Sequence, residues 1–193
     1  MLKFLSLFVA TAFITTGCEQ KKEAQNQEVT EEKNGFFPVT QYLLGQLKEL
    51  DSLPVTPLKT ISSNGKIDSA WVNRDDIKLF LRPFLTPVID SQNLSEYFGE
   101  KSFLDQTINA FTFSYDPIKE LPDSLELKHW DIYVDPNNGK VKRVYIVKQL
   151  NTSPSQTLQF TWKQDHYCKI STITETGGTP QIKEEQLTWN FDE

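Results

Sequence analysis

The C-terminal half of the chain, residues 111–191, consists of short β-rich runs separated by turn residues. Its clearest unit is a pair of runs, 130–134 and 141–147, joined by Asp-Pro-Asn-Asn-Gly-Lys, a composition typical of a tight reversal. In the first run apolar residues alternate with Asp131 and Tyr133, which is the pattern of a strand with one dry and one wet face. The sequence therefore predicts a β-hairpin within an antiparallel sheet.

Six such runs follow one another between residues 111 and 191, with short connections. Sequential strands with short links favour an antiparallel meander, and its apolar face must be covered or the sheet must curl on itself. We therefore expect an α+β fold in which N-terminal helices cover a roughly six-stranded antiparallel meander sheet. A curled sheet is the alternative.

The part of the chain before the meander contains the expected cover. Apolar residues at helical spacing predict a helix over residues 41–50. The Asn-Gly pair at 64–65 predicts a hairpin turn, and Asn73 has the properties of an N-cap for a second helix. Residues 91–109 contain segments that are long enough for only one or two helical turns.

The first residues have the pattern of a signal peptide, residues 1–17, with a positive start and an apolar stretch too short for a bilayer core, which needs about 20 residues. Small residues, Thr15-Thr16-Gly17, lead to Cys18. This segment resembles the signal of bacterial lipoproteins, in which a small residue precedes an invariant, acylated Cys. Thr15 departs from the usual pattern, where Leu is commonest. The resemblance covers only the leader and implies lipid attachment at Cys18; an ordinary secretory signal is the alternative.

Residues 18–35 are polar and charged, with almost no apolar side chains to bury, so we expect a flexible tether there. Residues 36–193 are expected to form a single α+β domain. The resemblance then implies a protein of the cell envelope that is anchored through Cys18 to a membrane, which we expect to be the outer membrane of a Gram-negative bacterium. The sequence leaves open which leaflet faces the domain.

The composition restricts the class of partner. The formal net charge is −6, and the sequence contains no large cluster of Lys and Arg, so we expect no nucleic-acid binding. The expected partners are the membrane, through the lipid, and either an envelope protein or an apolar ligand.

Few residues offer catalytic chemistry. His166 and Cys168 have the spacing of a same-face pair on a strand, but a lone thiol in a strand is most often a small hydrophobe. The Asp75-Asp76 pair suits a helix N-terminus better than a catalytic or metal site. His129 is far from His166 in the sequence, and neither has metal-ligand spacing around it. We therefore expect no enzyme, no metal and no cofactor.

Two function classes remain, and the sequence assigns ligand-binding residues to neither. The first is a membrane-tethered, non-catalytic binding or assembly lipoprotein. The second is a carrier of an acyl or isoprenoid ligand, whose half-open, helix-covered sheet looks like the architecture of the outer-membrane lipoprotein carrier family, a likeness without a residue motif. The inner face is expected to carry no charge and to present an aromatic stripe, either as core or as pocket lining: Phe111, Trp130, Phe160, Trp162 and Trp189.

Overall fold

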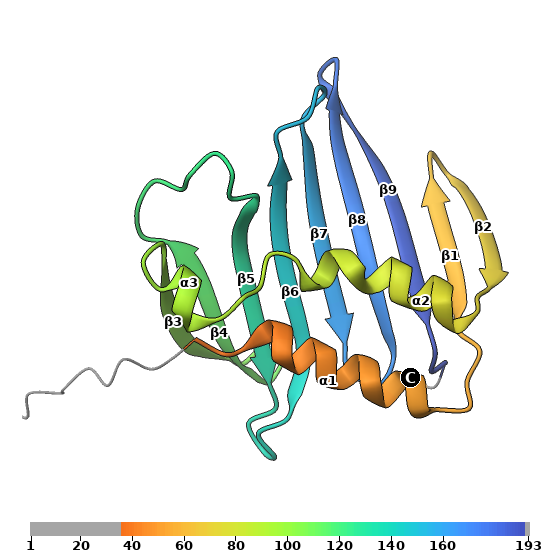
Figure 1. Ribbon diagram of the computed structural model, residues 1–193, viewed down its shortest axis with the longest axis horizontal. Coiled ribbons are helices and arrows are strands. Elements are labelled where there is room, and N and C mark those ends of the chain that lie inside the picture. Colours follow the sequence, from red (N-terminus) through yellow and green to blue (C-terminus); the bar gives the residue numbers. More distant parts are fainter. Residues whose placement is uncertain (1–35, 192–193) are drawn as a thin grey trace, which may run out of the picture. The chain divides into compact units, whose positions relative to one another are not determined.

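The computed structural model describes residues 36–191, which are organised around a nine-stranded antiparallel sheet (Figure 1). The strands are β1 (Leu58–Ser63), β2 (Lys66–Trp71), β3 (Phe98–Asp105), β4 (Ala110–Pro117), β5 (Leu127–Val134), β6 (Val141–Leu150), β7 (Gln156–Lys163), β8 (Tyr167–Thr176) and β9 (Thr179–Thr188). Their order across the sheet is β2-β1-β9-β8-β7-β6-β5-β4-β3. The first hairpin therefore pairs with the last strand, and β2 and β3 form the two edges of an open sheet.

The antiparallel sheet predicted from the sequence is confirmed, but the arrangement of N-terminal helices over six strands is wrong. The N-terminal part supplies three strands, β1 to β3, interspersed with short helices: α1 (Val39–Ser52), α2 (Arg74–Leu81), a 3-10 helix η1 (Arg82–Leu85) and α3 (Ser91–Leu94). The three strands lie at or next to the sheet edges and bury few side chains, so they lack a hydrophobic alternation. In the region 91–109, where segments of one or two helical turns were expected, α3 is such a segment but residues 98–105 form β3. Predictions for residues 1–35, including Cys18, lie outside the described residues.

Two of the hairpins turn through residue pairs with positive φ. In the β1–β2 turn Asn64 has φ 51° and Gly65 has φ 74°, and in the β8–β9 turn Gly177 has φ 61° and Gly178 has φ 89°. Two-residue turns with positive φ at both positions match the twist of antiparallel strands, and Asn and Gly adopt that region most easily. These turns fix the register of the two hairpins that meet at β9 and β1.

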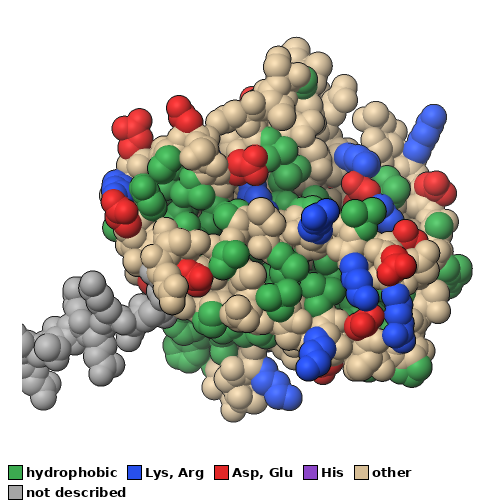
Figure 2. Space-filling model, in the orientation of Figure 1, with side chains coloured by type: hydrophobic (Ala, Val, Ile, Leu, Met, Phe, Trp, Pro, Cys, Tyr) green, Lys and Arg blue, Asp and Glu red, His purple; other side chains and the backbone are tan. Residues whose placement is uncertain are grey.

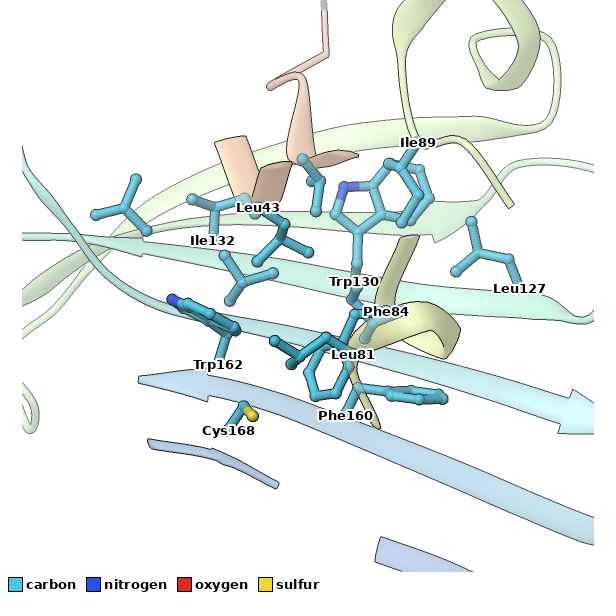
Figure 3. Packing of buried hydrophobic residues seen from close by; sticks show 14 of the residues in the cluster. Leu43, Leu81, Phe84, Ile89, Leu127, Trp130, Ile132, Phe160, Trp162 and Cys168 are labelled. Carbon is cyan, nitrogen blue, oxygen red and sulfur yellow. The ribbon is translucent and has the colours of Figure 1, made fainter. Parts of the chain in front are cut away.

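The helices α1 and α2 cross the same face of the sheet, which we call the covered face (Figure 1). Alternate residues of the strands point into the core beneath them, as the close view in Figure 3 shows for Trp130, Trp162 and Phe160. From the cover, Leu43 and Leu81 complete the packing. Hydrophobic side chains remain visible around the helices on this side (Figure 2).

A buried lysine forms hydrogen bonds between the sheet and the segment around η1 that covers it. Lys148 of β6 is 4% exposed and lies on the covered face, where no charge was expected. Its Nζ donates hydrogen bonds to the carbonyl oxygens of Pro83 and Thr86 and lies 4.5 Å from the ring centre of Phe160. The carbonyls at the end of a short helix need donors, and a buried ammonium group that forms no ion pair with residues 36–191 needs acceptors, so each satisfies the other.

The first prediction compares the stability effects of two aromatic residues of the predicted stripe, one buried and one exposed. Trp130 is fully buried and stacks on Tyr115 at 4.6 Å between ring centres, whereas Phe111 is 43% exposed. Trp130→Ala should lower the free energy of unfolding by about 3–5 kcal/mol. Phe111→Ala is the control and should change it by less than about 1 kcal/mol. Chemical denaturation measures both, and equal losses would contradict the packing described.

A second prediction concerns Lys148 and pH. Burial lowers the pKa of Lys148 to about 8, with Glu126 acting in the opposite direction. Above that pH the folded chain has released a proton that the unfolded chain still binds, so this group makes the free energy of unfolding rise with pH. Between pH 7 and 9.5 the wild type should gain about 1–2 kcal/mol relative to Lys148→Met. Urea unfolding of both proteins across this range tests the sign; a difference that stays constant with pH would contradict it.

Candidate functional site

The face of the sheet opposite the helices, which we call the open face, carries polar and aromatic side chains. In β5 the residues that alternate with the core positions are His129, Asp131 and Tyr133, and in β6 they are Arg143 and Tyr145. Direct cross-strand pairing places Asp131 next to Tyr145 and Tyr133 next to Arg143. The wet face predicted from the alternation in this hairpin is therefore a connected surface across adjacent strands.

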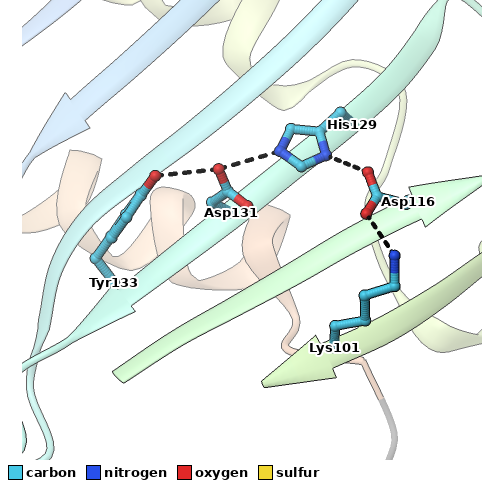
Figure 4. A network of polar contacts seen from close by, with 5 residues as sticks. All are labelled: Lys101, Asp116, His129, Asp131 and Tyr133. Atoms are coloured by element: carbon cyan, nitrogen blue, oxygen red, sulfur yellow. Dashed lines mark hydrogen bonds and ion pairs between the residues drawn. The ribbon is translucent and has the colours of Figure 1, made fainter. Parts of the chain in front are cut away.

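A chain of polar contacts runs through His129 on the open face (Figure 4). Its Nδ1 lies 2.9 Å from Asp116 Oδ1 on β4, and its Nε2 lies 3.0 Å from Asp131 Oδ2. Tyr133 donates its hydroxyl to Asp131 at 3.1 Å, and Lys101 of β3 donates to Asp116 at 3.3 Å. The network therefore joins three strands, β3, β4 and β5, through a histidine held between two carboxylates.

The charges in this network stabilise one another. The hydrogen bond to Asp131 raises the pKa of His129; burial acts in the opposite direction, and Asp116 adds to the rise. Burial acts to raise the pKa of Asp131, but the hydrogen bonds from His129, Ser114 and Tyr133 outweigh it and the pKa is lowered. Both shifts favour an imidazolium between two carboxylates. With both ring nitrogens occupied, His129 lacks a free position for general-base chemistry.

A second feature is a hollow of about 280 Å³ at the C-terminal end of α1. Trp162 and Trp189 contribute rings 5.1 Å apart between their centres, and Glu49 and Asp165 contribute carboxylates. The remaining lining residues are Gln46, Leu50, Leu53, Val55 and Asn190. The hollow is partly apolar, but it contains ionisable groups, which differs from the uncharged pocket expected on the covered face.

The structure does not bring His166 and Cys168 together as a catalytic pair. Cys168 is fully buried in the core on the covered face, and burial raises the pKa of its thiol well above the usual value. His166 precedes β8 in a turn, where strand alternation does not apply, and its backbone carbonyl accepts from the amides of Trp189 and Asn190. The interpretation of Cys168 as a small core hydrophobe therefore fits its place in the fold.

The other candidates from the sequence also have structural roles. Asn73 Oδ1 accepts from the backbone amides of Asp75 and Asp76 at 2.9 and 3.0 Å, so the Asp pair opens α2 as the capping interpretation predicts. Of the aromatic stripe, Phe111 is exposed, and the other four are core residues, two of which line the hollow at the end of α1.

One part of the open-face network could have been predicted from the sequence, although the search for metal-ligand spacing around His129 did not find it. His129 and Asp131 are two residues apart in a strand, so their side chains share a face, and a carboxylate at this spacing can hold the imidazole. Asp116 has no such signal, because its approach to His129 depends on the pairing of β4 with β5. Within residues 36–191 no group of His, Cys, Asp and Glu is arranged to bind a metal ion.

Comparison of the chain with protein-family models, with curated proteins and with solved structures finds no match. Within the described part of the chain, none of the helices has the length and apolar character needed to span a membrane.

The His129 network predicts a pH dependence. Because the pKa of His129 is raised in the folded state, its contribution to stability is complete below the unfolded pKa of about 6.5 and is lost as pH rises through the folded pKa. His129→Gln should therefore destabilise the protein more at pH 5.5 than at pH 8.5 in urea unfolding. The control is His166→Gln, because the other histidine forms no ion pair with a described residue. A larger loss at pH 8.5 would contradict this sign.

Proposed function

We propose that the protein is a membrane-tethered, non-catalytic binding or assembly lipoprotein of the bacterial envelope that binds its partner through the open face of the sheet. The observation that carries this proposal is the open face itself: aromatic and charged side chains lie on adjacent strands in fixed cross-strand positions. Aromatic residues and Arg are typical of recognition surfaces, because they combine large contact area with directional polar groups.

Two observations support a non-catalytic role. The imidazole of His129 is held by carboxylates on both ring nitrogens, and the thiol of Cys168 is enclosed in the core. Nucleophilic or general-base chemistry needs such a group near a substrate with a free lone pair. The leader's resemblance to lipoprotein signals supports the tether, with Cys18 as the lipid attachment site.

A carrier of an apolar ligand is the second candidate, favoured by the hollow beside Trp162 and Trp189. It ranks lower because Trp130, Ile132, Phe160 and their neighbours pack together beneath the helices, and the hollow described above lies at the end of α1 instead. The carboxylates of Glu49 and Asp165 at this hollow would also repel the head group of a fatty acid.

The proposal is tested by photo-cross-linking of the full-length protein in cells. A photoreactive phenylalanine derivative is placed at Tyr145 on the open face and, as the matched control, at the exposed Lys48 on α1. We expect a discrete adduct in the envelope fraction from position 145 and none from position 48. Cys18→Ala in the Tyr145 variant should leave unlipidated precursor and abolish the adduct.

Each part of the proposal has its own contradicting result. Equal adducts from positions 48 and 145 would mean that the open face is not the binding surface. A Cys18→Ala protein that is still processed and partitions into detergent like the parent would contradict the lipid anchor.

A further inference from the structure

Four residues form one row across the open face. Tyr133 of β5 pairs directly with Arg143 of β6, Arg143 with Lys163 of β7, and Lys163 with Tyr167 of β8. Residues directly opposite on neighbouring antiparallel strands have side chains about 5 Å apart at their Cβ atoms. The row therefore presents two adjacent cations between two phenol rings.

The cations Arg143 and Lys163 repel each other, and neither is paired with a carboxylate among residues 36–191. Like charges directly opposite on paired strands are destabilising. Among residues 36–191 neither Arg143 nor Lys163 forms an ion pair. Asp105 is close enough for the charge of Arg143 to act on its carboxyl, but it does not reach ion-pair distance. In a chain with a net charge of −6, a repelling pair that forms no ion pair with residues 36–191 is suited to an external anion.

A third cation and a hollow complete the site. The row borders a hollow of about 240 Å³, which Lys142, Ile108 and Ala110 also line. Lys142 Nζ lies 3.4 Å from the carbonyl oxygen of Ile108, at the β3–β4 turn, so its long side chain closes one side of the hollow. Lys142 likewise forms no ion pair with a described residue.

The rings determine what kind of anion fits. Arg143 lies with its guanidinium carbon 3.9 Å from the ring centre of Tyr133, and Lys163 Nζ lies 5.8 Å from the ring centre of Tyr167. Stacking on Tyr133 orients the planar guanidinium, which binds phosphate and carboxylate through two hydrogen bonds at once. The phenol ring of Tyr167, two strands away from Arg143, offers a flat apolar surface at the same hollow.

We infer that this site binds an oxyanion, either phosphate or carboxylate, that is carried by a molecule with a flat ring. The site consists of the row Tyr133, Arg143, Lys163 and Tyr167, together with Lys142. The inference deepens the proposed function, since it rests on the open face being the binding surface. It does not depend on the lipid anchor.

Isothermal titration calorimetry of the full-length protein in an uncharged detergent tests the inference, with phenyl phosphate as the probe. Phenyl phosphate should bind, and inorganic phosphate and phenol should each bind at least fivefold more weakly, because each lacks one half of the recognised group. Arg143→Gln and Lys163→Gln should weaken phenyl phosphate binding at least tenfold. Raising the salt concentration should also weaken it.

The matched control is Lys66→Gln, which removes the same charge from an exposed position on the edge strand β2. It should leave binding unchanged. Thermal unfolding of Arg143→Gln and Lys163→Gln should show equal or higher midpoints than the wild type, because each change removes the repulsion. Absence of phenyl phosphate binding, or equal weakening by Lys66→Gln, would overturn the inference. The photo-cross-linking from Tyr145 would then still report independently on the open face as a protein-binding surface.

Competition with a lipid phosphate tests whether the ring is part of the recognised group. Dihexanoyl phosphatidic acid carries a phosphate monoester without a ring, and it should displace phenyl phosphate at least fivefold more weakly than unlabelled phenyl phosphate does. Displacement by phosphatidic acid as effective as that by phenyl phosphate would overturn the requirement for a ring and assign the site to a lipid head group.

Discussion

The structure depends on keeping one face of a nine-stranded sheet away from water. An open sheet of this width cannot bury that face against itself, so α1, α2 and η1 supply the other half of the core. Apolar packing holds the helices in place, but it has little directional preference. Lys148 adds direction, because its ammonium group bonds two specific carbonyls of the cover and so fixes where η1 lies on β6. A charge at the centre of an apolar layer thus contributes to positioning.

The two faces of the sheet carry different kinds of side chain. On the covered face the side chains are large, apolar and enclosed, and the one hollow that we describe beneath the cover's edge is small and contains carboxylates. On the open face, charged and phenolic side chains of β5 and β6 are linked through the strand pairing itself. His129 is held by its neighbours on two strands, whereas within residues 36–191 Arg143 and Lys163 form no ion pair. This contrast between a neutralised network and two cations without an ion pair among residues 36–191 supports the inferred oxyanion site.

The sequence predicted those elements whose side chains have contrasting environments. The alternation around Trp130 and Ile132 was informative because one face is dry and the other wet. The sequence predicted the edge strand β2 only weakly. All of its residues are exposed, so apolar and polar residues do not alternate along it. Lys148 was not predicted as a core residue, since the carbonyls that satisfy it come from a distant segment. The same holds for Asp116, whose contact with His129 depends on strand pairing, so most of the open-face site could not be found without the structure.

The pairing of β1 with β9 has a consequence for the order in which the protein can assemble. Lys59 lies opposite Leu187, so β1, the first strand of the sheet to be synthesised, can pair with β9 only after all the other strands have been made. A two-stranded hairpin is marginally stable alone, and pairing between residues far apart in the sequence is slow to form. Until β9 is present, the β1–β2 hairpin has no sheet to join, and β8 is an unprotected edge. The strand β9 therefore joins the β1–β2 hairpin to the rest of the sheet, and a chain that is cleaved before β9 would also lose β1 and β2, which pair with the sheet only through it.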